Sequence, residues 1–238
     1  SKNTKSLYIK IIRQFFEFHW NIGLKEVTTA HITLYLKNQG EVSHSTLNIN
    51  RSCLSSLFDF LCRTGYLTFN PVKAVKSKKI QVHIDGKIIP VESIKRMFEF
   101  AGNERNLLIL KCLYYLALRE SELINLIPSN FYEIEEGRAK LTIKGKGNRI
   151  RTIHVPSQLW TDLKMFINDN SIKKNEFIFS DEKSNHQNPL SRQMIFKIVK
   201  SVAKNAKIEP VPSPHWFRHS SSRHALDNGA NIFEISKT

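Results

Sequence analysis

The sequence is poor in cysteine and in acidic residues, and it contains no long apolar run. Cys53, Cys62 and Cys112 are the only cysteines among 238 residues, an odd number without CxxC spacing. This pattern argues against a disulfide framework or a cysteine metal site and predicts reduced, buried thiols in a reducing compartment. The longest apolar stretch, residues 107–118, contains Lys111 and is shorter than the ~20 apolar residues that span a bilayer.

The charge is strongly unbalanced. Lys and Arg together number 36 against 21 Asp and Glu, which gives a net charge of +15. An excess of this size predicts a polyanionic partner, with nucleic acid as the first candidate and an anionic membrane surface as the second. No signal peptide opens the sequence. The 41% of hydrophobic residues is enough to build sizeable cores.

Residues 1–76 are predicted to form a helical domain. Apolar residues recur at helical spacing in three segments, and Ser43 or Ser45 is in position to cap the third. The stripes are Leu7, Ile11, Phe15 and Phe18, then Ile32, Tyr35 and Leu36, then Leu47, Leu54, Leu57, Phe58 and Leu61. Residues 77–90 carry no helical stripe and follow Lys76, so we interpret them as a basic interdomain linker. Lys76, Lys78, Lys79 and Lys87 would suit a strap across a DNA backbone, or equally a solvated loop.

Residues 91–238 predict a second, α+β domain. Helices are expected at 92–101, 104–117, 121–127, 157–169, 191–206 and 214–228. Between them, strands near 131–134, 140–144 and 149–155 predict a three-stranded antiparallel sheet with a glycine-rich hairpin tip. The expected fold class is therefore mainly α with a small antiparallel β-sheet.

The first candidate site residue is Arg119, which lies where one apolar helix ends and another begins. Ser121 is a possible cap for the new helix, and Glu122 is placed to orient the guanidinium. An arginine at such a junction can grip two phosphate oxygens with its forked side chain. Taken alone, the segment is better explained as an arginine paired with Glu122 at a surface turn, because such pairs are common.

The second candidate is the hairpin tip, where Lys146 lies between Gly145 and Gly147 and is flanked by Lys144 and Arg149. Glycines allow the backbone to approach DNA closely, so a lysine there can enter a groove and donate a proton. An ordinary exposed hairpin with basic residues is the simpler alternative in isolation.

The third candidate is the segment from Ser213 to His219. Ser213 is a suitable N-cap and Pro214 a suitable first helical residue. His215 and Arg218 then lie one turn apart on one face, at a helix end that attracts phosphate. An imidazole there can move a proton near neutral pH. A core histidine beneath a helix start is the structural alternative.

The order of Arg119, Lys146, His215 and Arg218 resembles the tyrosine recombinase, or phage integrase, family over nearly the whole chain. The most specific matches are the run Leu118–Leu123 and the run from Pro214 to Ile232. The resemblance implies a two-domain DNA clamp, with a helical, SAM-like core-binding domain at 1–76 and the catalytic domain at 91–238. It also implies double-stranded DNA as partner, dimers or tetramers on DNA, no cofactor, no metal, no membrane, and a prokaryotic, nucleoid-associated cytoplasmic location.

The resemblance also implies roles for single residues. Arg119 and Arg218 would hold the scissile phosphate, and Lys146 would be the general acid for the leaving 5′-hydroxyl. His215 would act as general acid/base on the nucleophile side, with Glu122 as a supporting carboxylate. The expected DNA contacts are Lys76, Lys78, Lys79, Lys87, Lys144, Arg149 and His219.

The sequence departs from the family pattern at its end. The nucleophilic tyrosine expected after the last motif is not present in this chain, and we interpret Tyr114 and Tyr115 as core residues. The start at Ser1 and an uncapped amphipathic segment at 232–238 predict a fragment of a longer protein. The expected function is site-specific recombination in a phage, mobile element or chromosome-resolution system. The alternatives are a non-catalytic DNA-binding or regulatory protein with the same fold and, third, a type IB topoisomerase.

Overall fold

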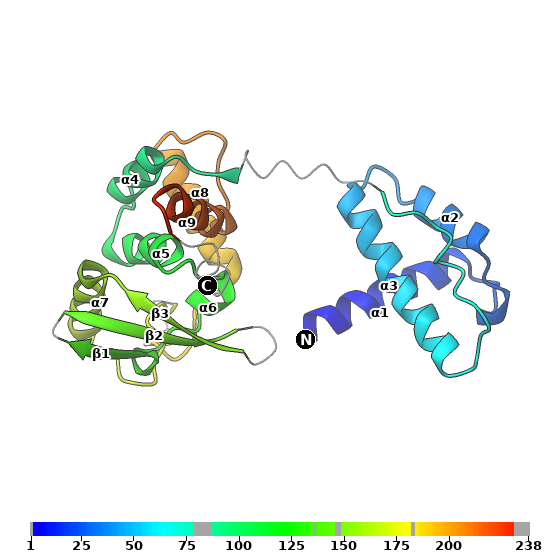
Figure 1. Ribbon diagram of the computed structural model, residues 1–238, viewed down its shortest axis with the longest axis horizontal. Coiled ribbons are helices and arrows are strands. Elements are labelled where there is room, and N and C mark those ends of the chain that lie inside the picture. The colour runs from blue at the N-terminus through cyan, green and yellow to red at the C-terminus, as the bar shows by residue number, and fades with distance from the viewer. Residues whose placement is uncertain (1, 79–86, 136, 146–148, 182–183, 231–238) are drawn as a thin grey trace. The chain divides into compact units, whose positions relative to one another are not determined.

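The chain divides into two compact units, Ser1–Val82 and His83–Thr238 (Figure 1). The computed structural model describes residues 2–78, 87–135, 137–145, 149–181 and 184–230. Within these ranges, no helix is both long and apolar enough to cross a membrane.

The first unit is helical. It contains α1 (Lys2–Phe18), the 3₁₀ turn η1 (Leu24–Glu26), α2 (Thr29–Lys37) and α3 (His44–Arg63). Of the two serines expected to cap α3, the structure uses Ser43, whose Oγ accepts a hydrogen bond from the Thr46 N–H at 3.2 Å. The apolar stripes converge on one core that includes Phe15, Ile32, Tyr35, Leu54 and Phe58.

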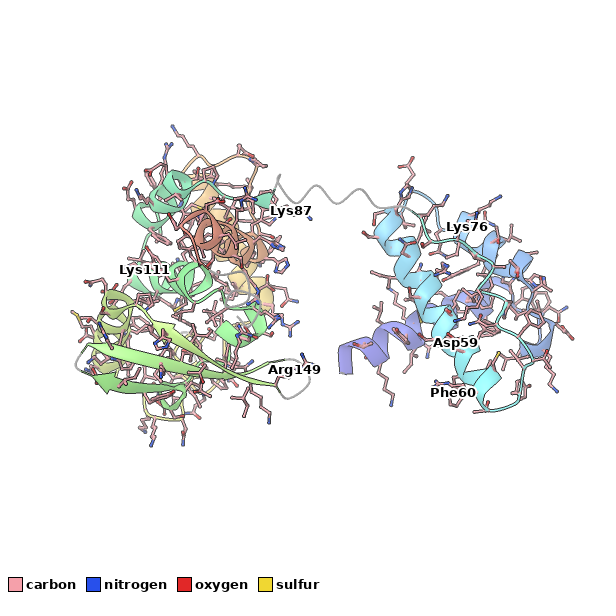
Figure 2. All side chains as sticks on the ribbon, viewed as in Figure 1. Asp59, Phe60, Lys76, Lys87, Lys111 and Arg149 are labelled. Carbon is pink, nitrogen blue, oxygen red and sulfur yellow. The ribbon has the colours of Figure 1, made fainter. Side chains whose placement is uncertain are left out.

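The chain that follows α3 packs back along that helix. The Asn70 amide donates to Asp59 on α3 at 2.9 Å, while its oxygen accepts the Val72 N–H at 2.8 Å. The Asn48 side chain forms two hydrogen bonds with the backbone of Lys78, at 2.8 and 2.9 Å. Figure 2 shows Asp59 on α3 and Lys76 on the returning segment. The described chain up to Lys78 therefore belongs to the first unit, although we expected a linker to begin at residue 77.

The second unit combines helices with a small sheet. Its helices are α4 (Val91–Glu99), α5 (Glu104–Tyr115), α6 (Glu120–Leu123), α7 (Ser157–Asp169), α8 (Arg192–Asn205) and α9 (Pro214–Asp227), with the 3₁₀ turn η3 (Pro128–Asn130). Strands β1 (Phe131–Glu135), β2 (Arg138–Lys144) and β3 (Ile150–Val155) form an antiparallel sheet in the order β1-β2-β3. The prediction of a mainly helical fold with one small antiparallel sheet is confirmed.

Helix α5 is the centre of this unit. It contacts α4, α7, α8 and α9, and five of its residues are buried: Leu108, Ile109, Leu110, Cys112 and Leu113. Lys111, labelled in Figure 2, forms an ion pair of 2.6 Å with Asp162 on α7. The packing of α5 against these four helices fixes the position of the residues at its C-terminal end, just before Arg119.

The cysteines are free thiols, as predicted. Cys53 and Cys112 are buried, and Cys62 is half-buried. Burial raises the pKa of the Cys53 thiol to about 11 and raises that of Cys112 as well. Protonated thiols of this kind are weak nucleophiles and contribute to packing.

Candidate phosphate-binding site

Arg119 lies at a sharp reversal between α5 and α6. Ala117 has a left-handed backbone with φ of 47°, and the neighbouring Leu116 and Leu118 are buried. This reversal leaves the Arg119 side chain 47% exposed beside the core. The prediction that Ser121 caps α6 is wrong, because the helix begins at Glu120 with Arg119 as N-cap. The Glu122 carboxylate takes the capping role, and its Oε2 accepts the Arg119 N–H at 2.8 Å.

Glu122 is the anionic centre of the site. Its side chain is 5% exposed, and its Oε1 accepts a hydrogen bond from Arg119 Nη1 at 2.8 Å. Arg151 on β3 donates from both terminal nitrogens to the two carboxylate oxygens, each at 2.8 Å. Burial by itself would raise the pKa of Glu122, but the hydrogen bonds from Arg151 and Arg119 outweigh it and hold the pKa below its usual value. The carboxylate therefore stays ionised near neutral pH.

The N-terminal turns of α9 bring a second arginine to the same place. Ser213 occupies the N-cap position and Pro214 is the first helical residue, as predicted, although the Ser213 side chain forms no capping hydrogen bond. Arg218 is half-buried, and its Nη1 donates a hydrogen bond to the carbonyl of Ala117. The pKa of Arg218 is lowered by burial and then by the charges of Arg119 and Arg151. The contacts bring the three guanidinium groups together, because Arg119 and Arg151 share the Glu122 carboxylate and Arg218 binds the carbonyl two residues before Arg119.

His215 lies one turn before Arg218 on α9 and is exposed. The pKa of its imidazole is lowered, first by loss of solvation and then by the nearby charges of His219, Arg218, Lys87 and Arg119. The rings of His215 and His219 pack edge to face, with centroids 4.3 Å apart. His215 is therefore neutral near pH 7 and able to accept a proton.

A pocket of about 380 Å³ joins these elements. It is lined by residues of the α5–α6 junction, the start of α8 and the start of α9: Leu118, Arg119, Glu120, Ser121, Arg192, Pro214 and His215. A larger pocket of about 470 Å³ lies at the start of α5 and contains none of the predicted site residues. The pocket at Arg119 and His215 is the relevant one, because it alone of the two joins a guanidinium and an imidazole at a helix N-terminus.

The basic residues of the hairpin flank its tip. Lys144 and Arg149 are exposed, and Arg149 is labelled in Figure 2 near the start of β3. The N–H of Gly145 donates to the carbonyl of Arg149 at 2.7 Å and closes the base of the hairpin. Lys146, the predicted general acid, lies outside the described residues.

The remaining predicted DNA contacts fall into two groups. Lys76 and Lys78 are exposed and belong to the first unit, whereas Lys87 and His219 lie in the second unit near His215. Lys79 lies outside the described residues.

Two arginines of the site were missed by the sequence reasoning. Arg192 is the first residue of α8 and lines the pocket. Arg151 alternates with the buried Ile153 and Val155, so it lies on the inward face of β3. A charged residue at an inward position requires a buried partner, and that pattern was the available signal.

Two tyrosines before the site differ in their surroundings. Tyr114 is half-buried, and its hydroxyl shares a hydrogen bond of 2.9 Å with His224 on α9. Tyr115 is 48% exposed and packs against Tyr114 and Phe98, so the prediction that it is a core residue is wrong. Its side chain extends outward because α5 buries its neighbours Leu113 and Leu116 instead.

Arg119 and Arg218 supply forked donors, and His215 supplies a neutral imidazole at a helix N-terminus. Such a set fits the two free oxygens of a phosphodiester and a proton transfer beside it. Together with the net charge of +15, this arrangement defines the class of proteins that bind and process nucleic acid.

Comparison with known proteins identifies the family. Residues 87–238 match the phage integrase family, and residues 1–66 match the phage integrase N-terminal SAM-like domain. The chain belongs to the phage integrase family. A tyrosine recombinase of Pseudothermotoga lettingae is 29% identical over 98% of this chain and 81% of its own length.

Two solved structures show the same fold. The XerH site-specific recombinase in a pre-cleavage complex with its difH substrate has a TM-score of 0.75 at 19% identity, covering 99% of this chain and 71% of that one. A lambda integrase dimer bound to a COC′ core site has a TM-score of 0.74 at 17% identity, covering 98% and 67%.

Proposed function

We propose that this protein is a tyrosine-type site-specific recombinase, which cuts and rejoins DNA strands through a covalent phosphotyrosine intermediate. The observation that carries the proposal is the meeting of two distant segments in a member of the phage integrase family. Arg119 at the start of α6 and His215 on α9 line one pocket, Glu122 holds Arg119, and Arg218 on α9 binds the carbonyl of Ala117, two residues before Arg119. Integration, excision and resolution of DNA all use this chemistry.

Each side chain has a role in the proposed reaction. Arg119 and Arg218 bind the non-bridging oxygens of the scissile phosphate and stabilise the charge that develops on them. A tyrosine hydroxyl attacks phosphorus and loses its proton to His215, which is neutral and exposed for this purpose. Lys146 protonates the departing 5′-oxygen. The phosphotyrosyl bond retains the free energy of the cleaved phosphodiester bond, so the strand is rejoined by the same reaction in reverse.

The nucleophilic tyrosine is proposed to lie outside residues 1–238. Tyr114 is engaged with His224 inside the unit, and no tyrosine lines the pocket at Arg119 and His215 in the part of the chain that the structure describes. Glu122 is proposed to orient Arg119. Its carboxylate accepts two hydrogen bonds from Arg119, which supports this role.

DNA binding is proposed to involve both units as a clamp, with the catalytic domain at 91–238 and the helical domain at 1–76 joined by residues 77–90. The proposed DNA contacts are Lys87, Lys144, Arg149 and His219 in the second unit and Lys76, Lys78 and Lys79 in the first. Protomers would assemble as dimers or tetramers on paired sites at the nucleoid of a prokaryotic cell. The dimeric, DNA-bound lambda integrase supports this assembly.

The test is formation of a covalent protein–DNA adduct. Full-length protein is incubated with its native site carrying a nick beside the scissile phosphate, so that the released fragment diffuses away and traps the intermediate. A denaturant-resistant adduct is expected, and Arg218→Ala protein serves as the inactive control. Tight, site-specific binding without any adduct would contradict the proposal and support a non-catalytic DNA-binding protein.

A further inference from the structure

Arg151 is a charged residue on the inward face of a strand. Its side chain is 14% exposed, and it shares that face of β3 with the buried Ile153 and Val155. Removing a guanidinium from water is costly unless it is paired and hydrogen-bonded. A partner of opposite charge must therefore offset the desolvation cost of Arg151. That partner belongs to the candidate site.

The partner is the Glu122 carboxylate, which also holds Arg119. Arg151 binds both carboxylate oxygens in a forked arrangement with two distances of 2.8 Å. Arg119 uses its backbone N–H and only one terminal nitrogen on the same carboxylate, while its side chain stays 47% exposed. The forked geometry, which is the stronger one, therefore belongs to the buried arginine and not to the one at the pocket.

This division of the carboxylate has an electrostatic consequence. One negative charge is shared between two guanidinium groups, so Glu122 does not neutralise Arg119 by itself. The pKa of Arg218 is lowered by both Arg119 and Arg151, after burial, and only partly restored by Glu122. Three guanidinium groups and one carboxylate leave this neighbourhood with a net positive charge, which is the charge that a phosphodiester requires.

The base of the hairpin rests on the same ion pair. A methyl group placed on Gly145 would lie 3.7 Å from Glu122 Oε1 and 3.8 Å from Arg151 Nη1, which is van der Waals contact. The ion pair is thus enclosed between β3, α6 and the backbone of Gly145.

The geometry points to Arg151 as a positioning residue that, by occupying Glu122 in a forked ion pair, keeps the Arg119 guanidinium free to bind the scissile phosphate. This inference rests on the proposed recombinase function. Without Arg151, the Glu122 carboxylate would draw Arg119 into a forked pair of its own and withdraw it from the pocket. Arg151 acts through Glu122 and is not itself a catalytic residue.

The experiment compares Arg151→Met, Arg151→Lys and the double variant Glu122→Gln/Arg151→Met in the full-length protein. Adduct formation is measured in single turnover at saturating DNA, and the Kd for the same DNA is measured in the same buffer. Arg151→Met is expected to slow cleavage by about a hundredfold, the effect of a small misplacement of a reacting group, with little change in Kd. Arg151→Lys retains the charge and should be intermediate.

The double variant separates positioning from folding. With no carboxylate charge left to capture Arg119, it should cleave at least about tenfold faster than Arg151→Met, an energetic coupling of the size seen between contacting residues. Lys111→Met is the matched control, because it breaks another partly buried ion pair, Lys111 with Asp162, and neither residue lines the pocket. It should lower the unfolding midpoint as Arg151→Met does and leave the cleavage rate of folded protein unchanged.

Three results would overturn the inference: wild-type cleavage by folded Arg151→Met, equal losses in binding and cleavage, or a double variant no faster than the single one. A second measurement, which does not depend on DNA cleavage, tests the role of Arg151 separately from the proposed recombinase function. The Nε–H NMR signal of Arg119 is titrated with inorganic phosphate, whose affinity should fall in Arg151→Met and recover in the double variant. If wild-type protein forms no adduct, the recombinase proposal fails, while this titration still decides the role of Arg151.

Discussion

Replacement of Arg218 by lysine is expected to uncouple cleavage from binding. The guanidinium of Arg218 is proposed to serve two partners, because Nη1 is bound to the carbonyl of Ala117 and the remaining nitrogens would bind the phosphate. A lysine ammonium is a compact point charge and cannot span both partners in the same way. The variant keeps the charge that attracts DNA but loses the fork that fits the transition state.

The size of the effect follows from these two losses. Loss of one aligned donor to a developing oxyanion costs about 3 kcal/mol, or a factor of about 10² in rate. If the ammonium turns to the phosphate instead, the carbonyl of Ala117, a buried residue with 6% exposure, is left without this donor at a cost of about 1–3 kcal/mol in stability. In either case the Kd should change by less than about threefold, because most affinity comes from many phosphate contacts along the site.

The assay measures single-turnover adduct formation and DNA binding at one fixed salt concentration, with thermal unfolding as a check on folding. Arg96→Lys on α4 is the matched control, because Arg96 is exposed and does not line the pocket. Equal losses in binding and cleavage, or cleavage at the wild-type rate, would refute the assignment of Arg218 to the phosphate.

Three further predictions concern the charge, the imidazole and the first unit. The logarithm of the binding constant should fall linearly with the logarithm of salt concentration, by about 0.9 for each phosphate contacted, and a flat dependence in a binding titration would contradict a DNA clamp. Because the folded pKa of His215 lies below its ordinary value of 6.5, the unfolded chain takes up this proton first. The wild type should therefore lose stability relative to His215→Gln as the pH falls below 6.5, with no such difference at higher pH, as urea unfolding at several pH values would show. Asn48→Ala should speed hydrogen exchange of the Lys78 amide about fivefold, since about 1 kcal/mol of hydrogen bonding is lost; unchanged exchange would mean that Asn48 does not hold this segment.

Much of the helical structure was predictable because its causes are local. In the segment 157–169, nearby residues alone indicate the apolar stripe and both ends of the helix, and the expected bounds match those of α7. Ser213 and Pro214 likewise mark the start of α9 without reference to the rest of the chain. The prediction that Glu122 orients Arg119 depended on a spacing of three residues, and the structure confirms the contact.

The features that sequence reasoning missed depend on distant partners or on backbone geometry. Arg151 gains its meaning from Glu122, 29 positions earlier, and a strand with one inward arginine does not reveal which carboxylate it meets. The left-handed backbone of Ala117 carries no signal in its residue type, because glycine and asparagine are the usual residues there. Similarly, Lys78 lies in a lysine-rich segment that is typical of a linker. The amide of Asn48, 30 positions away, binds the Lys78 backbone and holds it against α3.

Ser220 connects the segment before α4 to helix α9, which carries His215 and Arg218. This buried residue on α9 accepts a hydrogen bond of 2.7 Å from the backbone N–H of Ile89 and donates one of 2.8 Å to the carbonyl of Trp216. Ile89 lies two residues before α4 and is itself buried. The segment that leads into α4 is therefore fastened directly to the helix that carries His215 and Arg218.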